Sequence, residues 1–152
     1  MNTDTAIANL TVQSAAFVHR GNIPRRYACD GEGLNPAIAW EGVPEDADSV
    51  VLIMDDPDAP KGLFTHWLVW NIPPGAMIEE NSNPGLSGTN SAGKTGYHPP
   101  CPPNGRHRYY FRMYALDMPL DLPPGSDRAD LETAMHGHII ARGELMGYYE
   151  KQ

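Results

Sequence analysis

The sequence has only two cysteines, Cys29 and Cys101, and no long hydrophobic run. Two cysteines are too few for a disulfide scaffold and do not form a Cys-x-x-Cys pair, so we expect reduced thiols, with a single bridge left open. The first ten residues lack the basic and apolar regions of a signal peptide, and nowhere do about 18 apolar residues run together. We therefore expect a soluble, cytoplasmic protein without a transmembrane segment.

Basic charge is also scarce. Lys and Arg together number 11 and Asp and Glu number 19, which gives a formal net charge of -8. A chain with this charge repels a polyanion at long range, so we expect no nucleic-acid partner. A local anion site is still compatible with the charge, because backbone N–H groups and a protonated histidine act at short range.

Familiar catalytic signatures are absent from the sequence as well. It contains no Gly-x-Ser-x-Gly elbow, no His-Glu-x-x-His, no Walker loop and no Gly-x-Gly-x-x-Gly. Polar clusters of Asp and His without an evident nucleophile favour a binding site over covalent catalysis. We expect a protein that is not an enzyme, with no catalytic residue, no metal and no cofactor.

The composition that is present indicates one globular domain spanning residues 1–152. Apolar residues make up 41% of the chain and charged residues only 20%. Fifteen glycines and fifteen prolines divide the sequence into short segments, well above the average use of about 12% for the two together. This punctuation favours strands and loops over a helical bundle.

Apolar and β-branched segments predict strands at residues 10–17, 37–40, 50–54, 67–72, 108–116 and 139–149. The uninterrupted apolar run at 50–54 is typical of a central strand that is covered on both faces. One helix is expected after the Pro-Pro-Gly at 123–125, with Ser126 or Asp127 as its N-cap and Gly137 at its end. The segment 139–149 could instead continue that helix, but its β-branched pair and two glycines favour a strand.

The first polar cluster is the Asp-Pro-Asp-Ala-Pro at residues 56–60, which follows the predicted buried strand and precedes His66. The prolines restrict the backbone and fix the direction of Asp58. A carboxylate such as Asp56 near His66 would accept its N–H and raise its pKa, leaving a cation suited to a phosphate or carboxylate oxygen. Alternatively, the aspartates only cap backbone N–H groups of a turn. A cis bond at Ala59–Pro60 would suit a sharp bend.

The second polar cluster runs from Cys101-Pro102-Pro103 to His107 and Tyr109. In an extended segment, His107 and Tyr109 share one face with apolar side chains, while the neighbouring arginines share the other face. The imidazole and the phenol would then line the mouth of a cavity. The alternative is that both are core residues with satisfied hydrogen bonds. Two such clusters on proline-stiffened loops suggest one preformed pocket.

Taken together, these motifs resemble the phosphatidylethanolamine-binding protein family, and most of all its small bacterial and archaeal branch of Raf-kinase-inhibitor-like proteins. The likeness covers nearly the whole chain. Beyond the two clusters it includes Tyr27-Ala28-Cys29-Asp30-Gly31, Asn35-Pro36, Trp40, Trp67, Gly105, Arg108, Ala115-Leu116-Asp117, Gly143-Glu144-Leu145 and Gly147.

The resemblance implies a mostly β fold of antiparallel sheets, of β-sandwich type, with a short helix near the C-terminus. It also implies a small cavity for phosphate, acetate-like anions or phosphorylated headgroups. The matching positions place Asp56, His66, Cys101, Pro102, Pro103, His107 and Tyr109 at this cavity, and Asp58 joins them as a candidate ligand-binding residue.

One departure from the family pattern concerns the donors around the anion. The resemblance implies that the backbone N–H of Cys101 donates to the ligand. Many relatives carry Gly just before the Pro-Cys-Pro-Pro run, whereas this chain has His98-Pro99. Pro99 has no N–H to donate, and His98 is the residue that could compensate.

Three functions compete at this point. The leading hypothesis is a non-enzymatic module that binds a small phosphorylated or carboxylated ligand and thereby regulates a kinase or protease partner. The second is a metal-assisted or general-acid hydrolase that uses Asp56, Asp58, His66 and His107. The third is a pure interaction protein, such as a kinase or protease inhibitor, that contacts its partner through loops 81–95 or 120–127.

Overall fold

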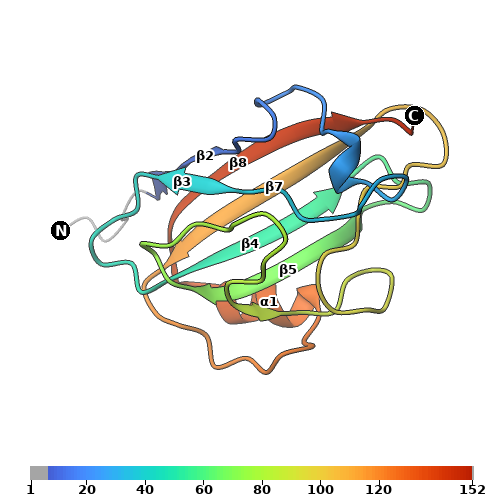
Figure 1. The fold of residues 1–152 in the computed structure, drawn as a ribbon. Helices are drawn as coiled ribbons and strands as arrows, with labels where there is room; N and C mark the ends of the chain where they lie inside the picture. Colours follow the sequence, from blue (N-terminus) through green and yellow to red (C-terminus); the bar gives the residue numbers. More distant parts are fainter. Residues whose placement is uncertain (1–6, 152) are drawn as a thin grey trace.

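The computed structural model describes residues 7–151 and is built around one large sheet (Figure 1). The six strands of this sheet lie in the order β1-β8-β7-β4-β5-β6, and a separate pair, β2 and β3, forms a small second sheet. The strands are β1 (Ala8–Asn9), β2 (Thr11–Gln13), β3 (Ala39–Glu41), β4 (Ser49–Asp56), β5 (Phe64–Ile72), β6 (Leu86–Ser87), β7 (His107–Leu116) and β8 (Ile139–Tyr149). One 3-10 turn, η1 (Arg25–Tyr27), and one helix, α1 (Arg128–Met135), complete the regular elements of this range.

The apolar run of β4 makes it the centre of the large sheet. Every residue of β4 is buried, and the strand pairs antiparallel with β5 on one side and with β7 on the other. The sequence of a strand that is buried on both faces is a continuous hydrophobic run. The predicted central strand is confirmed.

The two faces of the sheet are covered by different elements. Leu131 and Met135 of α1 pack with Val51 and Ile53 of β4 on one face. On the other face the core includes Val12 of β2 and Trp40 of β3, together with neighbouring side chains of β4, β5, β7 and β8. Figure 1 shows α1 and the β2–β3 pair on opposite sides of the large sheet.

The helix starts where the capping residues predict. Asp127 is the N-cap: its side chain accepts from the backbone N–H of Asp130, whose own side chain accepts from the N–H of Asp127. After the helix, Gly137 adopts a φ of 84°, a conformation that favours glycine. The buried carboxylate of Asp55 then accepts hydrogen bonds from Arg128 of α1 and Arg112 of β7, which fixes the helix to the sheet.

The predicted fold class is confirmed, with two differences in detail. The predicted strand at 10–17 is regular only at Thr11–Gln13. The large sheet is mixed because β1 pairs parallel with β8, although its other strand pairs are antiparallel. Gly143 of β8 allows this edge to form, because a Cβ there would lie 2.1 Å from the carbonyl oxygen of Leu10.

Candidate functional site

The candidate site lies where β4 ends and β7 begins. Asp55 pairs with Tyr110 in the antiparallel register, so the next residue, Asp56, lies beside Tyr109. The burial of β7 alternates from His107 onward, with His107 and Tyr109 buried and Arg108 exposed. The predicted inward face of this strand is therefore confirmed.

A β-bulge in β5 directs His66 to the same place. Met54 pairs with Trp67 and the next β4 residue, Asp55, pairs with Thr65, so His66 is an extra residue without a partner across the ladder. Bulges bend a strand and redirect a side chain, and they are common beside functional sites. Thr65 contacts Arg128 on the helix side of the sheet, whereas His66 lines a cavity with Asp56 and Tyr109 on the other side.

This cavity has a volume of about 170 Å³, smaller than the roughly 300–1,000 Å³ of pockets for drug-sized ligands. Its lining combines polar side chains with prolines and aromatic rings. The lining residues are Asp56, Ala59, Pro60, Phe64, His66, His98, Cys101, Pro102, Pro103, His107 and Tyr109. The structure therefore brings seven of the eight sequence-predicted site residues to one cavity.

A buried polar contact in the cavity joins Asp56 to His107. The Nδ1 atom of His107 lies 2.7 Å from Oδ2 of Asp56, and the other oxygen, Oδ1, accepts the backbone N–H of Asp58 at 2.8 Å. Both residues are less than one-tenth exposed. Because the carboxylate is held by two donors, it fixes the His107 ring with Nε2 as the nitrogen left for the cavity.

His66 is held by the main chain and not by a carboxylate. Its Nδ1 lies 2.7 Å from the carbonyl oxygen of His98, and the N–H of His98 donates to the carbonyl oxygen of His66. Burial lowers the pKa of His66 to about 4, outweighing the opposite effect of the hydrogen bond to His98. The predicted His66 cation is therefore wrong: at neutral pH the ring is uncharged, and Asp56 orients His107 in its place.

Tyr109 contributes a neutral hydroxyl group to the base of the cavity. Burial and the neighbouring carboxylate of Asp56 raise the pKa of Tyr109 well above its usual range. Its ring meets the His66 ring edge-on, with 5.3 Å between the ring centroids. Tyr109 is therefore a fixed, uncharged lining residue that keeps its proton at any physiological pH.

Asp58 is the one predicted site residue that does not line the cavity. Its two carboxylate oxygens accept hydrogen bonds from Nε and Nη2 of Arg108, and one also accepts the backbone N–H of Arg108. These bonds lower the pKa of Asp58 to about 2. Asp58 thus joins the loop after β4 to the start of β7, next to the cavity. The intervening bond Ala59–Pro60 is trans, which corrects the predicted cis bond, and no cis bond occurs between residues 7 and 151.

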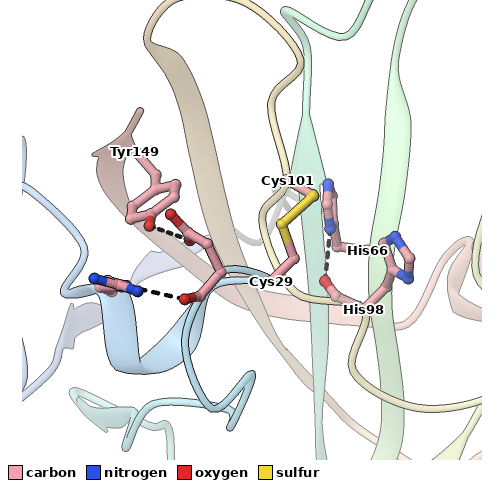
Figure 2. Close-up of a disulfide and its surroundings, with 7 residues drawn as sticks. Cys29, His66, His98, Cys101 and Tyr149 are labelled. Atoms are coloured by element: carbon pink, nitrogen blue, oxygen red, sulfur yellow. Dashed lines mark hydrogen bonds between the residues drawn. A yellow bond between two sulfur atoms is a disulfide. The ribbon is translucent and has the colours of Figure 1, made fainter. Parts of the chain in front are cut away.

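The cysteines form a disulfide, which corrects the expectation of reduced thiols. The Sγ atoms of Cys29 and Cys101 are bonded across 72 positions of sequence. Figure 2 shows this bridge beside the pair formed by His66 and His98, with Tyr149 on its far side, where the phenol is hydrogen-bonded to Asp30. The backbone N–H of Cys29 donates to the carbonyl of Pro100 at 3.0 Å. The bridge therefore fastens the cavity wall at 101–103 to the segment that follows η1.

Four lining residues were not among the sequence-predicted site residues: Ala59, Pro60, Phe64 and His98. Ala59 and Pro60 belong to the first motif, and only the fold shows that their side chains reach the cavity. Phe64 is the register partner of Asp56, and its ring lies 4.7 Å from that of His66, centroid to centroid. His98 carried a usable signal, because it directly precedes the Pro-Pro-Cys-Pro-Pro run.

The chain belongs to the phosphatidylethanolamine-binding protein family, because the model of that family matches residues 13–150. Within the family it belongs to the bacterial and archaeal branch that includes the UPF0098 proteins and YbcL. It is 46% identical to a UPF0098 protein of Methanothermobacter thermautotrophicus over 150 residues, covering 93% of this chain and 99% of the relative.

Solved structures agree with this assignment. A phosphatidylethanolamine-binding protein homologue from Chlamydia trachomatis shares 44% identity with a TM-score of 0.91, covering 97% of this chain and 100% of the homologue. YbcL of E. coli shares 26% identity with a TM-score of 0.86, covering 95% and 100% of the two chains. A carboxypeptidase Y inhibitor, solved in complex with its proteinase, shares 19% identity with a TM-score of 0.56 over 95% and 83%, and this likeness shows the fold alone.

Two further observations concern residues 7–151. No helix in this range is both long and apolar enough to cross a membrane. The same residues contain no group of three or more His, Cys, Asp or Glu side chains that could hold a metal ion. The metal-assisted alternative therefore has no candidate ligand set in the described part of the chain.

Proposed function

We propose that this protein is a non-enzymatic binding module that holds a small oxyanion, above all a phosphoryl group, in the cavity at the ends of β4, β5 and β7. The observation that carries the proposal is the Asp56–His107 pair at the base of that cavity. The buried carboxylate holds Nδ1 of His107 and fixes that ring, so Nε2 is the nitrogen of His107 that meets a ligand in the cavity.

A second donor on the wall supports the same ligand class. Within the described range, the backbone N–H of Cys101 donates to no protein acceptor, and Cys101 lines the cavity. Pro102 and Pro103 beside it have no N–H and cover the ligand with apolar surface. An oriented imidazole, one backbone donor and a small volume suit a compact oxyanion.

The geometry of the cavity favours ligand binding over covalent catalysis. Neither Nε2 of His66 nor Nε2 of His107 is hydrogen-bonded to a Ser, Thr or Cys side chain of residues 7–151, so the Asp56–His107 pair has no nucleophile to activate there. A general-acid hydrolase is the competing proposal. Release of phosphate from a panel of phosphomonoesters, at a rate that depends on His107, would support that competitor.

The exchange Asp56→Asn tests the proposal. An amide oxygen still accepts the N–H of His107 but makes a weaker hydrogen bond than a carboxylate, so the ring is held less firmly and we expect phosphate to bind about 10- to 100-fold more weakly. Isothermal titration calorimetry at pH 7 measures the change.

The matched control is Asp117→Asn, because Asp117 forms an exposed carboxylate–imidazole pair with His138 at 2.9 Å, away from the cavity lining. This variant should bind phosphate like the wild type. Equal dissociation constants for the wild type and Asp56→Asn, with both variants folded, would contradict the proposal.

Regulation of a kinase or protease partner extends the proposal to a second molecule and rests on the resemblance alone. If ligand occupancy controls the partner, the double variant His66→Ala/His107→Ala should lose the regulation together with the ligand. A partner that binds this variant as well as the wild type would instead identify a pure interaction protein.

A further inference from the structure

The hydrogen bond between His66 and the main chain decides what its ring offers to a ligand. A carbonyl oxygen can only accept, so the 2.7 Å contact from Nδ1 to the carbonyl oxygen of His98 places the proton of the neutral ring on Nδ1. Its other nitrogen, Nε2, then carries a lone pair and no proton. Figure 2 shows this nitrogen on the side of the ring away from the carbonyl of His98.

The lone pair of His66 Nε2 faces the cavity. No side chain or backbone group of residues 7–151 donates to it. It is not fully buried either, because the only fully buried side-chain polar atom without a hydrogen-bond partner in that range is Ser87 Oγ. Because His66 lines the cavity, the unpartnered nitrogen is the atom that it exposes there. A ligand that fills the cavity must therefore satisfy an acceptor at this point.

Nothing packed around His66 supplies the missing proton. Tyr109 and His107 approach it from β7, Asp56 from β4, and Phe64 and His98 complete its surroundings. Burial lowers the pKa of His98, so this ring is also uncharged at neutral pH. The ring of His66 stays neutral for the same reason, and its tautomer is fixed by the main chain.

The backbone N–H of Cys101 offers the opposite group. It donates to no protein acceptor among residues 7–151, and Cys101 lines the same cavity as His66. The cavity thus presents an acceptor, Nε2 of His66, and a donor, the N–H of Cys101. The acceptor follows from the contact of His66 Nδ1 with a carbonyl oxygen, and the donor lies in a run of prolines that have no N–H of their own.

We infer that the cavity selects oxyanions that carry a proton of their own, with their O–H donating to His66 Nε2 and an unprotonated oxygen accepting from the backbone N–H of Cys101. The inference rests on the proposed function and names the chemical form of its ligand. Hydrogen phosphate meets both requirements near neutral pH. Sulfate has the same shape but no proton, so it leaves His66 Nε2 unpaired inside the cavity.

The direct test compares hydrogen phosphate with sulfate at pH 8, where both anions carry two negative charges. We expect phosphate to bind the wild-type protein about 10- to 100-fold more tightly, because sulfate would leave a buried acceptor unsatisfied. Calorimetric titration with each sodium salt at constant ionic strength measures the ratio. Equal affinities, or tighter sulfate binding, overturn the inference and leave the proposed function standing, whereas binding of neither anion overturns the proposed function itself.

The variant His66→Gln tests whether His66 is the discriminating residue. A side-chain amide can present either its oxygen or its N–H₂ group, so the variant should bind sulfate more tightly and discriminate less than about threefold. The control is His138→Gln, which should keep the wild-type ratio because His138 does not line the cavity. An unchanged ratio in a folded His66→Gln variant overturns the assignment.

A measurement on the wild-type protein keeps the inference testable if His66→Gln fails to fold. Ring nitrogen chemical shifts from NMR distinguish the two neutral tautomers of histidine. We expect His66 to show a protonated Nδ1 and an unprotonated Nε2 at pH 8, with and without phosphate. A proton on Nε2 in the free protein overturns the inference, whatever the anion affinities are.

Discussion

His66 and His107 are both buried at the cavity, yet their surroundings give them different chemistry. The carboxylate of Asp56 holds Nδ1 of His107, whereas Nδ1 of His66 is held by a main-chain carbonyl group. Burial disfavours the ionised form of a base, and it lowers the pKa of His66 to about 4. The ring of His66 is therefore uncharged near neutral pH.

The low pKa of His66 has a consequence for stability. In the unfolded chain a histidine has a pKa of about 6.5, and in the folded protein that of His66 is about 4. Between these values the unfolded state binds more protons, so the contribution of His66 is fully present above pH 6.5 and is lost as the pH falls toward 4. The full loss is about 3 kcal/mol of the free energy of unfolding.

Urea unfolding at pH 7 and pH 5 measures this effect. Carboxylates also titrate over part of this range, so the comparison must be made with His66→Gln, which lacks the ring. We expect the wild type to lose about 2 kcal/mol more than the variant between the two pH values. The same pH dependence in both proteins would show that His66 is not held in its neutral form.

At the level of elements, the segment 98–103, which includes the cavity wall at 101–103, forms few backbone hydrogen bonds. Four of its six residues are prolines and cannot donate. Its remaining attachments include the bond from His98 N–H to the carbonyl of His66, the bond from Cys29 N–H to the carbonyl of Pro100, and the disulfide. The disulfide therefore has a large share in holding this wall.

Removing the bridge should weaken the whole domain. For a disulfide that closes a long loop, the expected loss is about 2–4 kcal/mol of the free energy of unfolding. We expect this loss for Cys29→Ala/Cys101→Ala and for the wild type treated with a dithiol reductant, as measured by urea unfolding. The double variant serves as the control, because reductant should not affect it. A wild type whose thiols are shown to be reduced, but whose stability is unchanged, would contradict the assigned role.

The bridge also bears on the predicted location in the cell. Disulfides persist in oxidising compartments and are uncommon in the cytoplasm of most organisms. Cytoplasmic location stays a prediction from the sequence. Trapping the thiols of freshly lysed cells with an alkylating reagent, followed by mass spectrometry of Cys29 and Cys101, tests it, because a fully oxidised pair argues for another compartment.

For the whole molecule, the sequence predicted the features that depend on local patterning. Continuous apolar character identified β4 as central, and alternation along β7 identified the face with His107 and Tyr109. The cap at Asp127 identified the start of the helix. Each of these signals lies within a single segment, where side-chain periodicity and capping are expressed directly.

The two distant clusters were predicted to share one pocket, but the individual contacts between distant segments could not be predicted. The bulge at His66 exists only in relation to the register of β4, and the partner of its ring is a carbonyl 32 positions away. His107 and Asp56 meet across 51 positions, which left open which histidine the carboxylate would orient. A polypeptide segment carries no local signal for such contacts, so the partner of each ring and the tautomer of His66 could be assigned only from the fold.

The cavity exists because the sheet places the ends of three strands side by side in a molecule with a net charge of -8. An anion can bind there only if local donors outweigh the repulsion of the whole molecule. The most direct test is a phosphate titration followed by histidine ring NMR. We expect the ring signals of His66 and His107 to shift together and saturate with one dissociation constant, while those of exposed His138 stay in place. If the signals of His66 and His107 stay fixed at millimolar phosphate in the folded protein, the cavity is not an anion site.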